Sequence, residues 1–514
     1  MKTSINNTCY RLLKHCVICL IVVAFQVGFT DLALCQSAEL YVGAAYTDIT
    51  PPVGYAQYRG NSTGIDNPLY AKAIVFQQGE IKAALVICDL IRITSDLSRE
   101  VRTRVAKETG IEYSNIFLAA THTHTGPVYR FDLAEYMAWV RSVELSPENE
   151  KDYPAILIDG VSKSVMEANS ALQPTEISTG KAEVHGISFN RRFLLKDGSV
   201  RFNAGVGNPD IVRPAGPVDP QFPIILFRNL ADGSPTAALS NFALHLDTVG
   251  GLQFHADYPF YLSEELKNEF GPSFISVFSA GASGNINHID VSETPSPNTR
   301  FIGESLSNAF KEELPLLEAV SNTVLGVRSE TVFAPLQNFT PEEVEWAFSN
   351  VDDSIARWNV SHGMGTELAY RYEDDESQLY NERRFLQGIR KRKIQTLYQM
   401  REFGEAIAPS VGTLDWTLPL EIQVFRLSEE VAIVAIPGEL FVELGLKIKK
   451  LSPFENTIVI QMANQNITYV PTREAFRQGD YEVINSRLAP GGGELMVKSA
   501  LRMLEDLAAE LSDD

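Results

Sequence analysis

Apolar residues recur along this chain in short runs, and between the runs they follow the 3.6-residue period of amphipathic helices. The short runs predict strands, in chain order, at residues 40–45, 73–77, 82–90, 116–120, 274–278, 420–427, 431–436 and 457–461. The second and third of these strands are expected to form a hairpin. The helical period predicts helices at residues 95–109, 156–170 and 494–511. Residues 175–243 are rich in strands, broken by a loop at 205–217. Strands and helices therefore alternate, which predicts an α/β fold with mixed β-sheets flanked by helices.

The pattern changes at about residues 340–405, where the sequence becomes charged and helical. Residues 340–343 (TPEE) form a capping box with proline at the first helical position. We therefore expect a helical insertion there, on the protein surface. No linker rich in Gly and Ser, or in Pro and Thr, divides the chain, so residues 38–514 are predicted to form one large domain.

The first 37 residues have the layout of a signal peptide. Basic residues precede an apolar run at residues 16–25, and small residues follow at 33–38. The run is too short to span a bilayer comfortably, so we expect export to the periplasm or the extracellular space. A lipoprotein signal at Cys35 is a weaker alternative, because Leu34 is a poor residue before a lipidated cysteine. An uncleaved membrane anchor is the other alternative.

Charge and cysteine content narrow the class of protein. The formal net charge of −21 argues against nucleic acid as a partner, and against electrostatic docking on anionic lipid. Four of the five cysteines lie in the predicted leader, so the exported chain has no internal disulfide. The fifth, Cys88, lies in a predicted strand and is expected to be an inert buried thiol.

The richest candidate chemistry follows the predicted strand at 116–120. Residues 121–127 read THTHTGP, in a chain with eight histidines. His122 and His124 are two residues apart, so on an extended segment both side chains point to the same side. Neutral imidazole is a common metal ligand and proton carrier. The pair indicates a metal or catalytic site, although two such rings can also simply bond to loop backbone.

Three further apolar runs lead into polar segments, at residues 241–247, 433–439 and 464–472. Sites in α/β proteins are built at such strand ends, which makes His245, Glu439 and Tyr469 candidates. Each has an ordinary structural alternative: a core histidine, a carboxylate in the first turn of a helix, and a core aromatic ring. No compact motif such as His-Glu-x-x-His occurs, so any metal site must be assembled from distant positions.

Taken in order, these motifs resemble those of the neutral/alkaline non-lysosomal ceramidases. The matching segments are residues 43–51 (GAAYTDITP), 121–127 (THTHTGP), 190–191 (NR), 243–245 (ALH), 437–440 (PGEL), 469–474 (YVPTRE) and 481–482 (YE). Each motif is short, but the ordered set covers nearly the whole chain from about residue 40 to 510. The resemblance implies a fold like the catalytic domain of neutral ceramidases.

The resemblance also implies a Zn²⁺ cofactor and assigns residues to it. Four residues match the metal ligands of the family: His122, His245, Glu439 and Tyr469. Three others match residues placed beside the metal or the substrate carbonyl: His124, Arg191 and Tyr481. These three are the expected catalytic residues, although the identity of the general acid does not follow from the sequence.

The implied activity is that of a zinc-dependent amidohydrolase. It would cleave the N-acyl amide bond of ceramide or a related N-acyl lipid by attack of zinc-bound water. Two alternatives remain: a zinc hydrolase of a different amide or ester, and a non-catalytic lipid- or glycan-binding protein on the same scaffold. A lipid-like substrate leaves transient contact with a membrane surface open, and the oligomeric state is not predicted.

The sequence departs from the family pattern in two places. Ceramidases carry serines in the loop after the central strand, whereas this chain has Ala280 and Gly281 at the matching positions. Ser283 is either a substitute or an ordinary turn serine, and the second interpretation is favoured. Long members of the family carry an immunoglobulin-like tail, and this chain instead resembles the shorter bacterial relatives without one.

Overall fold

The computed structural model describes residues 39–57, 59–129, 153–292, 295–337 and 417–512. All of them belong to one compact unit, Glu39–Asp514. The predicted signal peptide (1–37) and the predicted helical insertion (about 340–405) lie outside the described residues. Both stay predictions, as does the single domain over 38–514.

The largest sheet in the described residues has nine strands and mixed strand directions. Eight follow the order β16-β14-β13-β8-β1-β5-β6-β7, and β18 pairs with β8. Pairing is antiparallel in the β5–β6 hairpin and parallel in β6–β7 and β14–β16. The strands are β1 (Leu40–Asp48), β5 (Tyr70–Gln78), β6 (Ile81–Cys88), β7 (Ile116–Ala120), β8 (Gln173–Glu183), β13 (Gln221–Asn229), β14 (Pro235–Phe242), β16 (Ile275–Ala280) and β18 (Glu318–Ala319).

A second sheet of four strands packs against the first. Its order is β19 (Thr323–Pro335), β20 (Thr417–Ser428), β21 (Val431–Ala435) and β23 (Asn456–Ile460). Alternate residues of a strand point to opposite faces, and β5 uses both faces. Ile74 and Phe76 join the core shared with β20, whereas Ala73 and Val75 join the core under the helices. Both faces of the large sheet are therefore covered.

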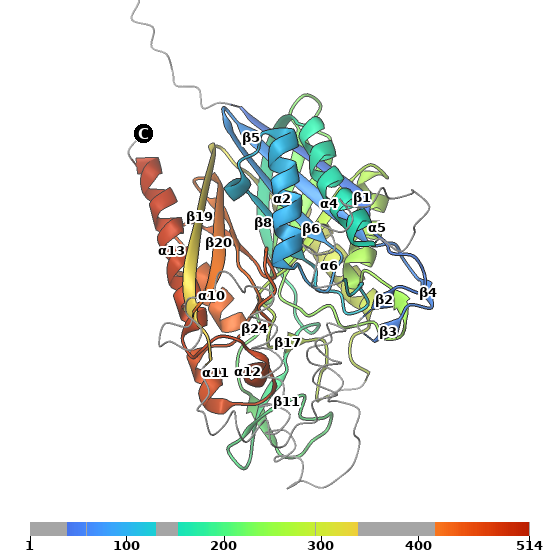
Figure 1. The fold of residues 1–514 in the computed structure, drawn as a ribbon, viewed down its shortest axis with the longest axis vertical. Helices are drawn as coiled ribbons and strands as arrows, with labels where there is room; N and C mark the ends of the chain where they lie inside the picture. The colour runs from blue at the N-terminus through green and yellow to red at the C-terminus, as the bar shows by residue number, and fades with distance from the viewer. Residues whose placement is uncertain (1–38, 58, 130–152, 293–294, 338–416, 513–514) are drawn as a thin grey trace, which may run out of the picture. The chain divides into compact units, whose positions relative to one another are not determined.

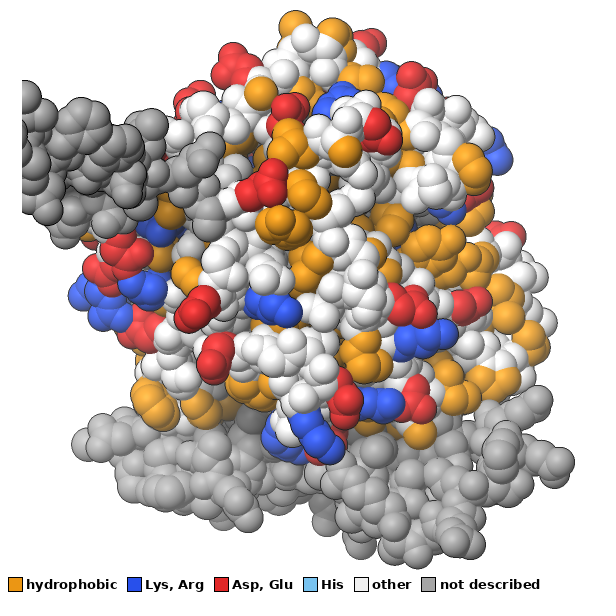
Figure 2. All heavy atoms as spheres, turned by 90° about the horizontal axis from the view of Figure 1, so that it is seen from above, with side chains coloured by type: hydrophobic (Ala, Val, Ile, Leu, Met, Phe, Trp, Pro, Cys, Tyr) orange, Lys and Arg blue, Asp and Glu red, His pale blue; other side chains and the backbone are white. Residues whose placement is uncertain are grey.

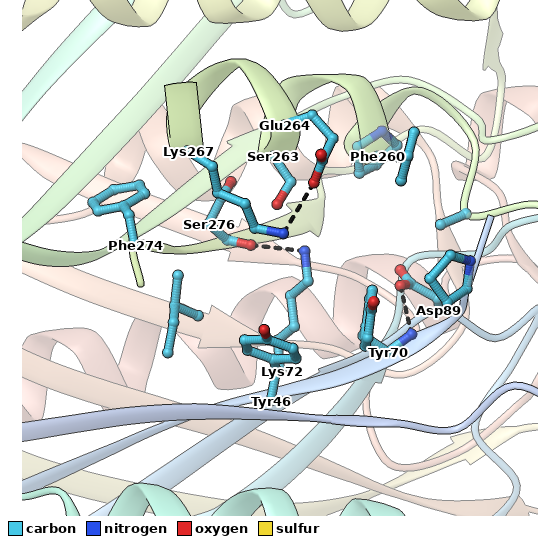
Figure 3. Close-up of a pocket in the computed structure, with 14 residues that line it drawn as sticks. Tyr46, Tyr70, Lys72, Asp89, Phe260, Ser263, Glu264, Lys267, Phe274 and Ser276 are labelled. Carbon is cyan, nitrogen blue, oxygen red and sulfur yellow. Dashed lines mark hydrogen bonds and ion pairs between the residues drawn. The ribbon is translucent and has the colours of Figure 1, made fainter. Parts of the chain in front are cut away.

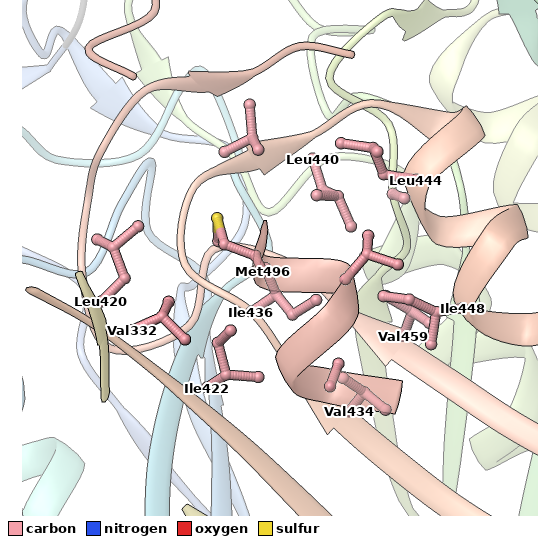
Figure 4. Close-up of a cluster of buried hydrophobic side chains, with 14 of the residues drawn as sticks. Val332, Leu420, Ile422, Val434, Ile436, Leu440, Leu444, Ile448, Val459 and Met496 are labelled. Carbon is pink, nitrogen blue, oxygen red and sulfur yellow. The ribbon is translucent and has the colours of Figure 1, made fainter. Parts of the chain in front are cut away.

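Helices form the outer layers on either side (Figure 1). α2 (Ser95–Thr109) and α4 (Tyr153–Ser170) cover one face of the large sheet. α10 (Val442–Leu451) and α13 (Gly492–Ala509) cover the second sheet. In Figure 4, Met496 of α13 lies among side chains that include Ile422 of β20 and Ile436, which follows β21. α5 (Tyr258–Phe270) and α6 (Thr299–Glu313) pack beside β16.

This architecture confirms the α/β fold with mixed sheets flanked by helices. Within the described residues, each predicted strand and helix is present, with ends shifted by a few residues. Two details were wrong. The expected loop at 205–217 contains β12 (Ile211–Pro214), because that segment pairs with β10 (Arg192–Leu195). Glu439 does not start a helix: it lies in β22 (Glu439–Leu440), and α10 begins at Val442.

Two further observations bear on the predictions from composition. Cys88 is a buried free thiol, and burial raises its pKa far above the ordinary value, which agrees with an inert role. Among the described residues, no helix is both long and apolar enough to cross a membrane. The face shown in Figure 2 carries acidic and basic side chains interspersed with apolar ones.

The packing of α4 on β1 depends on Gly43. A Cβ atom added there would overlap the backbone oxygen of Ala168 and approach the backbone nitrogen of Leu172 to 2.8 Å. We predict that Gly43→Ala lowers the free energy of unfolding by about 1–3 kcal/mol, because two backbones must separate. Gly250 is the control: it is exposed, and an added Cβ meets nothing within 4 Å. Gly250→Ala should change the value by less than about 0.5 kcal/mol in denaturant titrations.

Candidate metal centre

His122 lies two residues beyond the end of β7 in a strained backbone conformation. Its φ is 72°, in the left-handed region that few non-glycine residues adopt. Its backbone N–H donates to the carbonyl of Leu90, which fixes the turn. The ring Nδ1 donates to the carbonyl of Ile91 at 2.6 Å, since a carbonyl can only accept. In the neutral ring, Nε2 therefore carries the free electron pair.

His245 follows β14 and is held in the same manner. Its Nδ1 donates to the backbone carbonyl of Ser283 at 2.8 Å, so its Nε2 also carries an electron pair. Only 1% of the residue is exposed. Burial lowers the pKa of His245, and the positive charge of Arg191 adds to the effect. The neutral form of this ring is thus favoured.

Glu439 and Tyr469 are neighbours across a short parallel bridge. β22 pairs with β24 (Tyr469–Val470), so the two residues stand in register. Gly438 makes this possible, because its φ of 78° lets the chain turn after β21. Glu439 and Tyr469 are each 6% exposed. Burial raises the pKa of the Tyr469 phenol well above its ordinary value, so the phenol stays neutral.

Three electron-rich atoms meet at the centre of this arrangement. Glu439 Oε2 lies 3.4 Å from His122 Nε2 and 3.3 Å from His245 Nε2. Within the described part of the chain, neither Glu439 Oε2 nor His245 Nε2 makes a hydrogen bond, and both atoms are buried. Neutral rings with their protons on Nδ1 direct electron pairs at the carboxylate, which is unfavourable in a buried cavity. A cation between the three atoms would remove the conflict, so the residues present fit a metal ion.

His124 stands beside this centre. Its Nε2 lies 3.3 Å from His122 Nε2, and its Nδ1 lies 3.6 Å from Asp247 Oδ1. Burial lowers the pKa of His124 to about 3, although the charge of Asp247 opposes the shift. His122, His124 and His245 together form a group whose ligand atoms lie within 4.8 Å of one another and which could hold a metal ion. The two equivalent rings expected from the His-x-His spacing do face one centre, but through a turn and not along an extended strand.

Arg191 lies next to the centre in a buried ionic network. Its Nε donates to Glu482 Oε1 at 3.0 Å, and its Nη2 donates to the carbonyl of Gly284 at 2.6 Å. Arg192 completes the network with a 2.9 Å bond to Glu482 Oε2. Glu482 has no exposed surface, so one carboxylate holds two buried guanidinium groups. The network fixes the position of Arg191.

Tyr481 closes this side of the site. It is the first residue of α12 (Tyr481–Asn485), and its ring lies 5.4 Å from the Tyr469 ring. The guanidinium carbon of Arg191 lies 5.4 Å from the centre of the Tyr469 ring and 5.9 Å from that of Tyr481. The structure thus brings Arg191 and Tyr481 to Tyr469, which stands opposite Glu439.

The loop after β16 supports the centre through its backbone. A side chain at Gly281 would come within 3.0 Å of Ala243 N and Asn241 Oδ1, so this position has little room for a serine. Ser283 is fully buried, and its Oγ accepts a 2.8 Å bond from Gln461. Its carbonyl accepts the bond that orients His245, so Ser283 has a structural role at the centre that an ordinary turn serine lacks.

Sequence reasoning missed two residues that lie against His124. Asp247 faces its ring, and Arg59 donates to its carbonyl oxygen at 3.2 Å. Asp247 ends the apolar run 241–247, which was a signal for polar chemistry, but the run drew attention only to His245. No pattern in the sequence around Arg59 pointed to a role for this residue in the site.

A separate pocket lies between β5, β16 and α5 (Figure 3). Lys72 reaches across it and donates to the carbonyl of Ser276 at 2.9 Å, while Lys267 pairs with Glu264 at 2.9 Å. None of the site residues predicted from the sequence lines this pocket. The Lys72 contact joins β5 to β16, and the Lys267–Glu264 pair lies within α5, so both contacts have a structural role.

Two solved structures share the fold. One, described as a ceramidase complexed with C2, gives a TM-score of 0.64 at 18% identity and covers 92% of this chain and 76% of that one. The crystal structure of neutral ceramidase from Pseudomonas aeruginosa gives a TM-score of 0.61 at 19% identity and covers 92% and 75%. The fold is therefore a mixed α/β fold of the neutral ceramidase type.

Sequence comparison finds similarity to the same group of proteins. The family model described as "Neutral/alkaline non-lysosomal ceramidase, N-terminal" matches residues 40–251. Neutral ceramidase from Pseudomonas aeruginosa is 26% identical over 90% of this chain and 70% of its own length. Neutral ceramidase from Mycobacterium tuberculosis is 22% identical over 92% of this chain and 77% of its own length. The chain is thus similar to neutral/alkaline non-lysosomal ceramidases over most of its length, which confirms the resemblance in the ordered motifs.

The buried ion pairs of Glu482 with Arg191 and Arg192 are expected to contribute strongly to the free energy of unfolding. Glu482→Gln should lower the free energy of unfolding by about 3–5 kcal/mol, because it leaves two buried guanidinium groups without a counter-charge. The control is Glu474→Gln, which removes an exposed pair with Arg477 and should cost less than about 1 kcal/mol. Chemical denaturation measures both. Equal small effects would show that the network is solvated.

Proposed function

We propose that this protein is a zinc-dependent amidohydrolase that cleaves the N-acyl amide bond of ceramide or a related N-acyl lipid. The proposal rests above all on the convergence of His122 Nε2, His245 Nε2 and Glu439 Oε2 in one buried cavity. Similarity to neutral ceramidases supports the hydrolase class.

Four residues would hold the metal: His122, His245, Glu439 and Tyr469. Two imidazoles and a carboxylate are a common donor set for catalytic zinc and leave room for water or substrate. The neutral Tyr469 phenol would be a weaker fourth ligand, since it stands in register with Glu439. When bound, zinc would lower the pKa of a water molecule and polarise the amide carbonyl.

The remaining residues act on the substrate. Arg191 is held in place by Glu482 and Gly284, and with Tyr481 it would stabilise negative charge that develops on the carbonyl oxygen. His124 Nε2 is close enough to the centre to accept the proton released by the attacking water and then deliver it to the leaving amine. Both roles require fixed geometry, which the buried contacts of these residues support.

The relatives support the proposed substrate class. They are described as neutral ceramidases, and one solved relative is described as complexed with C2. A second candidate function is a zinc hydrolase of another amide or ester. It is favoured by the loop after β16, where Gly281 stands in place of the family's serine and the space is too crowded for a serine side chain. With a lipid-like substrate, the proposal includes transient contact with a membrane surface. The predicted signal peptide at residues 1–37 adds export to the proposal.

The metal content and the substrate are tested together. Purified protein should contain about one zinc ion per chain and release fatty acid from a short-chain fluorescent ceramide. Chelation should abolish the release, and added zinc should restore it. A panel of N-acyl amides and esters measures the preference. Zinc without ceramide cleavage would point to the second candidate, and lipid or glycan binding without zinc or hydrolysis to a binding protein.

His122→Ala tests the ligand assignment. The variant should lose most of its zinc, and kcat/KM should fall by more than about 100-fold, the upper range for changes around metal ligands. His185→Ala is the matched control, because His185 is a surface histidine with 68% of its side chain exposed. Elemental analysis and the ceramide assay measure both variants. Full zinc content in His122→Ala would refute the assignment.

A further inference from the structure

His124 differs from the other two histidines in what faces its Nδ1 atom. The rings of His122 and His245 are oriented by backbone carbonyls. For His124, the facing group is the side-chain carboxylate of Asp247, 3.6 Å from Nδ1. A backbone carbonyl stays in place whatever the side chains are, whereas Asp247 is a specific residue with a specific charge. The orientation of the His124 ring therefore depends on the side chain of Asp247.

Arg59 holds Asp247 in this position. Its Nη2 donates to Asp247 Oδ1 at 2.5 Å, while its Nη1 lies 3.2 Å from the carbonyl oxygen of His124 and 3.4 Å from that of Val249. One guanidinium therefore joins the segment before β4 (Gly64–Ile65), the loop after β7 and the loop after β14. The two loops are also tied by the backbone bond from His124 N to Leu246 O at 2.9 Å. Such fork-like contacts suit arginine because its donors are planar and fixed.

The carboxylate determines which nitrogen of His124 holds the proton. A negative oxygen beside Nδ1 favours N–H at that atom, as in the carboxylate–histidine pairs that orient rings around metal sites. The electron pair of Nε2 then points to the metal centre, where His122 Nε2 lies 3.3 Å away. The opposite tautomer would direct an N–H bond into the centre and an electron pair at the carboxylate.

We propose that Arg59 and Asp247 are positioning residues that fix the ring orientation and tautomer of His124 toward the metal centre. This inference rests on the proposed function, since His124 is assigned there to proton delivery. The pair is not primarily a stabilising contact. The side chains of Arg59 and Asp247 keep 29% and 40% of their surface exposed, and exposed ion pairs add little stability.

The chain offers a matched control. His255 Nε2 lies 3.6 Å from Asp66 Oδ2, the same distance as in the Asp247–His124 contact. Asp66 has 57% of its side chain exposed, and His255 is not among the histidines grouped around the centre. Asp66→Ala therefore removes a histidine–carboxylate contact of equal length and leaves Arg59, Asp247 and His124 unchanged.

The experiment compares Asp247→Ala, Asp247→Asn, His124→Ala, the double variant Asp247→Ala/His124→Ala, and Asp66→Ala in the zinc-loaded protein. We expect Asp247→Ala to reduce kcat by about 10- to 100-fold with KM changed less than threefold. Asp247→Asn, which keeps an acceptor oxygen, should retain more activity than Asp247→Ala. The double variant should be no slower than His124→Ala, because both changes remove the same function. Melting temperatures should shift by less than about 2 °C.

A second readout does not depend on catalysis. The ¹⁵N chemical shifts of labelled histidine side chains report the tautomer of each ring. The His124 signals, assigned by their loss in His124→Ala, should show a protonated Nδ1 that Asp247→Ala abolishes and Asp66→Ala preserves. An unchanged His124 tautomer in Asp247→Ala, or multiplicative losses of kcat in the double variant, would overturn the proposal. Failure of hydrolysis with the tautomer change intact would count against the proposed function alone.

Discussion

The site depends on one electrostatic constraint: two imidazole nitrogens are each held within 3.4 Å of the same carboxylate oxygen in a buried cavity. Each ring is locked by a bond from Nδ1 to a backbone carbonyl, so neither can turn its electron pair away. Several costly features serve this arrangement, including the left-handed backbone of His122 and the close approach of Gly284 to the backbone of Glu439. Backbone strain of this kind persists only where the surrounding structure maintains it. A bound cation would offset its cost in free energy and make the whole arrangement favourable.

The sheets explain how residues more than 300 positions apart in the sequence reach one point. His122, His245 and Ser283 each follow the carboxyl end of a strand in the large sheet, and Glu439 follows β21 of the second sheet. Parallel pairing in β6–β7, β14–β16 and β21–β23 places these ends along common edges. The packed faces of the two sheets then bring both edges together, as the contact of Phe117 with Phe425 at 5.1 Å illustrates.

Local patterns predicted the strands well because buried runs such as 116–120 are apolar throughout, and α2 ended at Gly110 as its sequence indicated. They predicted the site less well. The spacing of His122 and His124 showed that two rings face one centre, yet nothing local distinguishes His245 from a core histidine. Its proposed role as a metal ligand rests on contacts with Ser283 and Glu439, which only the fold brings near. Glu439 was misplaced because Pro437-Gly438 resembles a helix start, whereas pairing with Tyr469 draws the residue into a strand. Arg59 and Asp247 were missed because their importance lies in a contact between loops.

The residues of the candidate site come from two separate parts of the chain, and neither part can form the site alone. The part matched by the family's N-terminal model, residues 40–251, contains His122, His124, Arg191 and His245. The carboxylate, the phenols and the counter-ion of Arg191 come from residues 439–482. Without that second part, Arg191 and Arg192 would be buried without Glu482, and the two histidines would lack their carboxylate partner. Each half therefore stabilises charges that the other half introduces, so binding of a metal and completion of the fold are expected to be thermodynamically linked.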